Sequence, residues 1–306
     1  MSGTETGSDR TILWSVAGLF FLAVTWGYSW VFLKLALDDS GPMTFAGMRT
    51  MFAGIFLLGL LPLLGRSMKP TRVAETATLG FIQTTGFVGL TMLALVNGGA
   101  GRTSILVFTM PFWTLILARI FLHEKMEGLQ RVAIVVAAIG LWVILQPGAM
   151  GGQMISGLLA AGAGVVWAIS SVFTKQMHLR GAFDLISVSA WQMIMGSCVL
   201  IVVAMVIGEP PVRWTTQFIM CLTVTAIIST GLSWVVWSYV LEHLSASVAG
   251  LCMLGVPVIA LTSASFHLGE VPAVSDWIGM GLITAAMLLL SVHGWRNGRR
   301  EARVAM

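Results

Sequence analysis

The nine residues WGYSWVFLK, Trp26 to Lys34, return 141 residues later as WAISSVFTK, Trp167 to Lys175. Both copies have Trp first, Ser fourth, Val-Phe at the sixth and seventh positions and Lys last. Each copy lies within a long apolar run, so a polar stripe inside an apolar helix occurs twice in one chain. The recurrence predicts an internally duplicated fold.

Composition identifies the solvent in which this fold forms. Hydrophobic residues make up 57% of the 306 positions and charged residues 10%, whereas a soluble domain carries about 25% charged residues. Apolar runs of about 17 to 25 residues are long enough to cross a bilayer as helices. We therefore predict an all-α integral membrane protein with no room for a soluble domain. Its ten transmembrane helices are expected near residues 12–37, 45–65, 73–93, 102–122, 129–146, 154–179, 184–207, 215–241, 245–268 and 273–293.

Further matches extend the duplication over the whole chain. A shift of 145 or 146 residues aligns Thr84–Gly86 with Ser229–Gly231, Pro111 with Pro257, and Glu124 with Glu270. The chain thus divides into two halves of five helices, and because five is odd the second half must enter the bilayer from the opposite side. Inverted repeats of this kind are typical of secondary transporters, whose sites lie near mid-membrane between the halves. We expect a tail at 1–11, a first half at 12–147, an inverted second half at 153–293, a basic tail at 294–306 and a central cavity.

The distribution of positive charge predicts the orientation in the membrane. With both tails inside, the inner face collects thirteen Lys and Arg residues and the outer face three, Lys34, Arg102 and Arg213. This positive-inside pattern favours a bacterial-type inner (plasma) membrane with cytoplasmic termini, and we expect no nucleic-acid partner. The three cysteines lie in apolar segments without metal-ligand spacing, so packing is their expected role. We predict neither a metal nor a cofactor.

One apolar helix in each half carries a central Pro and ends in Glu. The two motifs are Pro111 with Leu122, His123 and Glu124, and Pro257 with Leu268, Gly269 and Glu270. With the ten spans and the two five-helix halves, they make the chain resemble the EamA-type transporters of the drug/metabolite transporter superfamily, over essentially its whole length. The resemblance implies a ten-helix fold around a central cavity, and the export or exchange of small metabolites, with amino acids, aromatic ones included, among the known cargoes.

The duplicated phrase supplies the first candidate site residues. Because helical side chains repeat every 3.6 residues, Trp26, Ser29 and Trp30 share one stripe, and Trp167, Ser170 and Ser171 share its counterpart. Lipid is a poor solvent for hydroxyls, so both stripes are expected to face the bundle interior. Two interpretations remain: the stripes line a substrate cavity, or they serve helix packing.

Other polar and aromatic residues lie deep in their predicted spans. Tryptophan rings at mid-depth either pack or form the wall of a site that suits flat, apolar cargo. A glutamine amide offers more hydrogen-bonding groups than its own helix satisfies, which favours an interior polar cluster. The remaining candidates for the cavity lining are Gln83, Thr84, Gln192, Trp234 and Trp237.

Charged residues and prolines are assigned with their alternatives. Lys34 and Lys175 fall near opposite ends of the bundle, where they either anchor at the interface or attract a carboxylate-bearing substrate to opposite mouths of the cavity. Arg49, about one turn from the outer end of its span, is either a charge at the cavity mouth or a structural partner of Asp38 or Asp39 in the adjoining outer loop. Pro111 and Pro257 each remove one helical hydrogen bond, as a hinge or as a fixed kink.

The positions of the acids bear on mechanism. All thirteen Asp and Glu residues lie in tails, loops or helix ends, whereas proton- and sodium-driven transporters usually hold one at mid-membrane. We therefore expect a transporter of small molecules that works by facilitation or exchange, as a monomer or weak oligomer. An intramembrane enzyme is disfavoured because neither G-x-S-x-G nor H-E-x-x-H occurs, and a channel because the sequence has no repeated filter segment.

Overall fold

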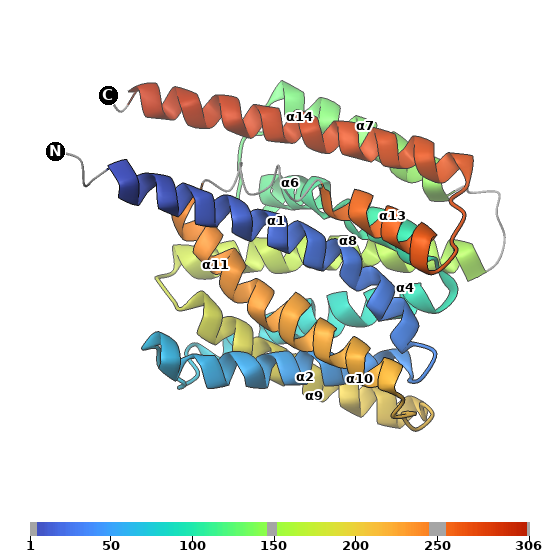
Figure 1. Ribbon diagram of the computed structural model, residues 1–306. Helices are drawn as coiled ribbons and strands as arrows, with labels where there is room; N and C mark the ends of the chain where they lie inside the picture. The colour runs from blue at the N-terminus through green and yellow to red at the C-terminus, as the bar shows by residue number, and fades with distance from the viewer. Residues whose placement is uncertain (1–4, 146–151, 245–254, 305–306) are drawn as a thin grey trace.

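The computed structural model describes the backbone of residues 5–145, 152–244 and 255–304, and the side chains of these residues except 5–12, 152, 241–242 and 295–304. All regular structure in these ranges is helical (Figure 1). The first half comprises α1 (Glu5–Ala36), α2 (Pro42–Leu60), η1 (Pro62–Leu64), α3 (Val73–Leu79), η2 (Gly80–Val88), α4 (Gly89–Asn97), α5 (Ala100–Val107), α6 (Met110–Phe121) and α7 (Gly128–Leu145). The second half comprises α8 (Gly152–Leu179), α9 (Leu185–Ile207), α10 (Thr216–Thr223), η3 (Val224–Leu232), α11 (Ser233–His243), α13 (Gly255–His267) and α14 (Val274–Val304).

These elements form the membrane spans that composition predicts. Within the described ranges, nine helical stretches are long and apolar enough to cross a bilayer. The tenth predicted span, 245–268, is represented by the shorter apolar helix α13, and its first residues, 245–254, lie outside the described residues. The all-α membrane fold is thereby confirmed. The second span begins at Pro42 rather than at 45, because proline is well suited to the first turn of a helix.

Local chemistry fixes the start of two spans in the second half. The Asp184 carboxylate accepts hydrogen bonds from the main-chain nitrogens of Ile186 and Ser187, at 2.9 and 3.1 Å. The Thr215 hydroxyl accepts one from Phe218 N at 3.0 Å. Each side chain satisfies donors that the first turn of a helix leaves unpaired. The predicted starts at 184 and 215 therefore fall on the capping residues of α9 and α10.

Helix packing reproduces the inverted repeat. The first helix of each half packs against the Pro-containing span of the other half, α1 against α13 and α8 against α5 and α6. The second helices, α2 and α9, pack against each other, and so do the fifth, α7 and α14, which Figure 1 shows side by side. The halves are therefore interleaved around a shared centre.

The third span of each half departs from regular α-helix at mid-depth. In the first half, η2 is a π-helix of 9 residues, and in the second half η3 is another of the same length. The bounds of the two π-helices, Gly80–Val88 and Val224–Leu232, lie within one residue of the shift that aligns Thr84–Gly86 with Ser229–Gly231, so they occupy nearly equivalent positions. π-Helical turns are rare and are frequent at functional sites. The sequence pattern does not predict them.

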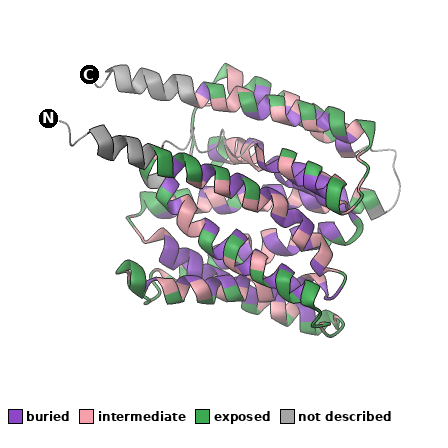
Figure 2. Cartoon of the chain, in the orientation of Figure 1, coloured by how far each residue is buried: buried purple, intermediate pink, exposed green. Residues whose placement is uncertain are grey.

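Burial is inverted with respect to a water-soluble protein. Large apolar side chains are exposed on the outer helices, such as Trp142 at 66% and Val206 at 80% of their full area. Polar side chains such as Thr84 and Gln192 are each only 2% exposed in the interior. Figure 2 shows buried residues concentrated on the inner helices and exposed ones along the periphery. An apolar exterior with polar groups inside is suited to a lipid solvent.

Candidate substrate cavity

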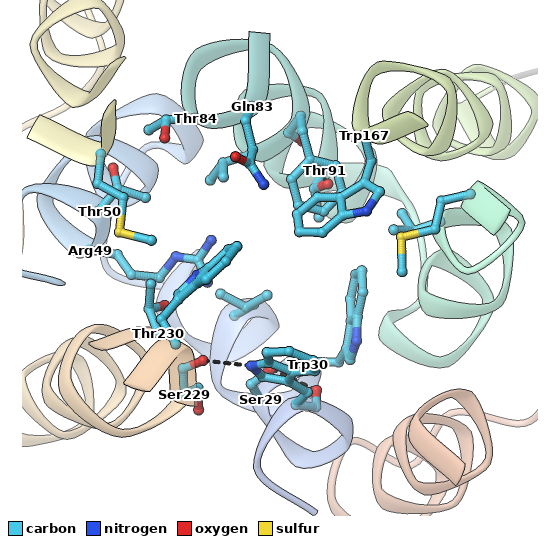
Figure 3. A pocket seen from close by; sticks show the side chains of 18 of the residues that line it. Ser29, Trp30, Arg49, Thr50, Gln83, Thr84, Thr91, Trp167, Ser229 and Thr230 are labelled. Atoms are coloured by element: carbon cyan, nitrogen blue, oxygen red, sulfur yellow. Dashed lines mark hydrogen bonds between the residues drawn. The ribbon is translucent and has the colours of Figure 1, made fainter. Parts of the chain in front are cut away.

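A cavity of about 270 Å³ lies between the two halves. Its lining comes from α1, α2, η2, α4, α5, α6, α8, α9, η3 and α11, so both π-helices contribute. Aromatic rings form much of the wall: Trp26, Trp30, Phe87, Phe108, Trp167, Trp234 and Trp237. The polar lining consists of Ser29, Arg49, Thr50, Gln83, Thr84, Thr91, Gln192, Ser229 and Thr230 (Figure 3). No acid is among the described lining residues.

The first copy of the duplicated phrase forms one wall of this cavity. The Trp26 indole Nε1 donates to the main-chain oxygen of Ser229 in η3 at 2.9 Å, the dashed line at Ser229 in Figure 3. The same ring lies 5.8 Å from the Trp237 ring, centroid to centroid. Ser29 donates to Trp26 O at 2.8 Å, and Trp30 is buried at 6% exposure. These contacts hold the indole of Trp26 against the π-helix of the other half.

The second copy is arranged differently from the expectation. Trp167 lines the cavity and meets the Phe87 ring of η2 edge-on, with centroids 4.8 Å apart. Ser170 and Ser171 are not among the lining residues, and their hydroxyls donate to Trp167 O at 2.7 and 3.0 Å. A serine inside a helix readily bonds the carbonyl three or four residues back, which satisfies the hydroxyl within its own helix. Ser29 makes the same bond and lines the cavity, so the bond does not separate the two copies, and the substrate-binding role of Ser170 and Ser171 stays a prediction.

Two of the predicted polar residues, Thr84 and Gln192, meet across the halves. Thr84 Oγ1 donates to Gln192 Oε1 at 2.8 Å, which joins η2 to α9. The neighbouring Thr85 Oγ1 donates to Gly196 O at 2.9 Å. Gln83 projects from the same π-helix into the cavity (Figure 3). One polar seam thus links the third helix of the first half to the second helix of the other.

Arg49 does not make the ion pair that is one of its two expected roles. Asp39 pairs instead with Arg213, at 3.2 Å between Oδ1 and the guanidinium, and also accepts from the Thr215 hydroxyl. Arg49 lines the cavity, and Figure 3 shows its guanidinium extending toward the centre. Its Nε is buried without a hydrogen-bond partner among the described residues. Arg49 therefore lines the cavity and does not pair with Asp39 of the outer loop.

Neither predicted lysine is among the described lining residues of the cavity. Lys34 Nζ donates to the main-chain oxygens of Leu95 and Gly98, at 2.5 and 3.0 Å. It therefore caps the carboxyl end of α4, where a cation is favoured by the helix dipole. Lys175 forms an ion pair with Glu124. Both lysines serve as structural contacts in this conformation.

The two prolines lie in helices of equivalent spans. The fourth span is interrupted between α5 and α6, and Pro111 stands in the first turn of α6. Pro257 lies in the described part of α13 and is buried. The cavity reaches Val107, Phe108 and Met110 at the interruption. The hinge assigned to Pro111 and Pro257 stays a prediction.

Several lining residues were missed by the sequence analysis. Phe87 and Thr91 follow Gln83 at intervals of four residues, so the helical period alone could have placed them on its face. Leu33 follows Trp26 at i+7 in the same way. No helical spacing from a predicted residue indicates the lining residues Thr50 and Met193, which are adjacent in sequence to Arg49 and Gln192.

Comparison with known proteins supports the same architecture. The EamA-like transporter family matches residues 13–146 and again 154–292. The chain is 28% identical to the uncharacterized transporter YoaV of Bacillus subtilis, covering 89% of this chain and 94% of that one. It is 29% identical to the probable amino-acid metabolite efflux pump of Salmonella typhimurium, covering 93% and 96%. It is also 24% identical to the uncharacterized inner membrane transporter YedA of Escherichia coli K12, covering 92% of each chain.

A solved crystal structure shares the fold. Its TM-score is 0.65 at 15% sequence identity, and the match covers 92% of this chain and 98% of the other. The family match occurs twice, once in each five-helix half. This chain therefore belongs to the EamA-like transporter family of the drug/metabolite transporter superfamily.

Proposed function

We propose that the protein is a secondary transporter that exports small metabolites, amino acids and aromatic ones in particular, across the inner membrane by alternating access. The observation that carries this proposal is the cavity between the inverted halves, with its tryptophan walls and hydroxyl and amide groups. Its volume of about 270 Å³ is slightly below the range of drug-sized pockets, which begins near 300 Å³, and it suits a molecule of amino-acid size. The similarity to a probable amino-acid metabolite efflux pump supports the same cargo.

Contacts between the halves favour alternating access. At the end of the bundle where α1 begins, Arg66 pairs with Asp184 at 2.9 Å, and Lys175 pairs with Glu124. At the opposite end, Arg213 pairs with Asp39. Each of these pairs joins one half to the other, and the cavity lies between the two sets. Breaking one set while keeping the other would open the cavity to one side.

The mode of coupling follows from the charge of the cavity. Its described lining contains no Asp or Glu, the residues that proton- and sodium-coupled carriers use at mid-membrane. We therefore favour facilitation or exchange. The thirteen to three distribution of Lys and Arg supports cytoplasmic termini. Alternative cargoes are another organic anion or a nucleobase-like or drug-like compound, and a channel is the alternative mechanism.

Counterflow in proteoliposomes tests the proposal. Purified protein is reconstituted and loaded with unlabelled phenylalanine, and uptake of trace labelled phenylalanine is compared with uptake into unloaded vesicles. Saturable uptake that is stimulated by the internal substrate is expected for a carrier. Linear flux without stimulation would contradict alternating access. A panel of labelled amino acids, organic anions and nucleobases in the same vesicles identifies the cargo.

A further inference from the structure

We propose that Arg49 holds the carboxylate of the substrate, and that the cavity accepts aromatic monocarboxylates whether or not they carry an α-amino group. The proposal rests on the proposed transport function and adds to it the group by which cargo is recognised. It follows from the burial and surroundings of Arg49, from the charge balance of the cavity and from the position of the aromatic wall.

Arg49 is a partly buried cation that lines the cavity and has no ion-pair partner among the described residues. Its Nε has no hydrogen-bond partner among the described residues. The nearest acids along the chain are committed elsewhere, since Asp39 pairs with Arg213. Glu209, which approaches the start of α2, accepts from the main-chain nitrogens of Met43 and Thr44 at 2.8 and 2.7 Å. A partly buried guanidinium without a carboxylate partner is costly, and a ligand carboxylate would complete its coordination.

The net charge of the described cavity lining indicates which class of ligand it binds. Arg49 is the single charged residue in the described lining, so the cavity complements one negative charge. A dianionic phosphate would call for more than one cation, and Lys34 and Lys175 are engaged in contacts away from this lining. The described lining also lacks a carboxylate that could pair with a substrate ammonium. Recognition therefore needs the carboxylate and does not need the amine.

The aromatic side chains of the cavity indicate which group the ligand carries at the end opposite its carboxylate. Figure 3 shows Arg49, Thr50 and Thr230 on one side of the cavity and Trp167 across it. Trp30, labelled beside Ser29 at the lower edge of the cavity in Figure 3, is a second indole of the lining. A carboxylate at Arg49 directs an attached ring toward these indoles, where stacking is favourable. Arylalkyl carboxylates, including the deaminated counterparts of aromatic amino acids, match this arrangement.

Ligand-induced thermal stabilisation of the detergent-purified protein tests the inference without requiring transport. A ligand that binds only the folded state raises the unfolding temperature. The probes are 3-phenylpropionate, which lacks the amine, 2-phenylethylamine, which lacks the carboxylate, neutral 3-phenylpropanamide, and phenylalanine. We expect stabilisation by 3-phenylpropionate and phenylalanine at concentrations at least tenfold below any effect of the amine or the amide. Equal effects of all four, or a preference for the amine, would overturn the proposal.

Variants assign the selectivity to Arg49. Arg49→Gln is expected to bind 3-phenylpropionate at least tenfold more weakly, whereas Arg49→Lys, which keeps the charge, retains part of the preference for anions. Lys69→Gln is the matched control, because Lys69 is exposed in a loop and its loss changes the net charge equally. Unchanged binding by Arg49→Gln would contradict the assignment. If Arg49→Gln does not fold, the four-probe comparison on the wild-type protein still decides.

The two proposals fail separately. Carboxylate-selective binding without counterflow of any compound in the panel would support Arg49 as the carboxylate-binding residue and contradict the proposed transport. If counterflow occurs and Arg49→Gln has the same half-saturating concentration as the wild type, the transport proposal stands and the role of Arg49 in binding the carboxylate is contradicted.

Discussion

The indole nitrogen of Trp26 donates to the main-chain oxygen of Ser229 at 2.9 Å and thereby ties the first helix of one half to the π-helix of the other. The counterpart of Trp26 in the second half, Trp167, contacts Phe87 of the first π-helix. Each duplicated tryptophan therefore touches the π-helix of the opposite half, and both tryptophans line the cavity. A change in the packing of the halves would move both rings with it.

Replacement of Trp26 tests the link between this contact and transport. Trp26→Phe keeps an aromatic wall but removes the hydrogen bond to Ser229, and Trp26→Ala removes both. We expect counterflow to fall in Trp26→Phe and to fall further in Trp26→Ala, because cavity shape and π-helix position both depend on the indole. Thermal unfolding should change less than transport. Trp142→Phe, on an exposed ring at 66%, is the control. Wild-type counterflow in Trp26→Ala would show that the ring is dispensable.

Close approach of two helices predicts a stability effect at Gly80. A Cβ at this position would lie 2.5 Å from the main-chain oxygen of Gln192 in α9, where no atom can be accommodated without movement. We expect Gly80→Ala to lower the free energy of unfolding by about 1–3 kcal/mol, a typical cost of overpacking. Gly162→Ala in α8 has nothing within 4 Å and should be neutral or stabilising, as expected for Ala in a helix. Thermal unfolding of both variants in one detergent makes the comparison.

The helical period explains what the sequence could predict of the cavity. It correctly placed Trp26, Ser29 and Trp30 on one interior face, because the phase of a helix is set by residue spacing alone. Ser170 and Ser171 are absent from the lining although they bond Trp167 O as Ser29 bonds Trp26 O. Spacing places residues on one face of a helix, but the packing of that helix in the bundle decides which part of the face the cavity reaches.

Arg49 and the π-helices show a different limit. Asp38 and Asp39 are near Arg49 in sequence, yet the partner of Asp39 is Arg213, which lies in the other half. Only the packing of the two halves brings that pair together. The π-helices η2 and η3 depend on which carbonyl each amide selects, and no residue pattern in Gly80–Val88 distinguishes that choice from α-helix.

Glu124 and Glu270 are equivalent in the repeat but have different partners, which predicts different effects on stability. Glu270 accepts from the main-chain nitrogens of Ala100 and Gly101, at 2.6 and 3.1 Å, and caps α5 from the other half. Glu124 pairs with Lys175, and both side chains are about half exposed. We expect Glu270→Gln to cost about 0.5–2 kcal/mol, as for loss of a helix cap. Glu124→Gln should cost about 0–1 kcal/mol, as for a surface ion pair. Equal losses in thermal unfolding would contradict this distinction.

Arg49 predicts an inverse relation between stability and binding. Replacing an unpaired, partly buried charge by an apolar side chain of similar length removes the cost of keeping that charge out of water. Arg49→Met is therefore expected to unfold at a higher temperature than the wild type in the absence of ligand. The same variant should lose stabilisation by 3-phenylpropionate. The difference in unfolding temperature between Arg49→Met and the wild type therefore shrinks or changes sign as the ligand is added. A residue with a purely structural role would behave in the opposite way, because its loss would lower the unfolding temperature at every ligand concentration. Thermal unfolding of both proteins over a titration of 3-phenylpropionate separates these outcomes, with Lys69→Gln as the charge-matched control.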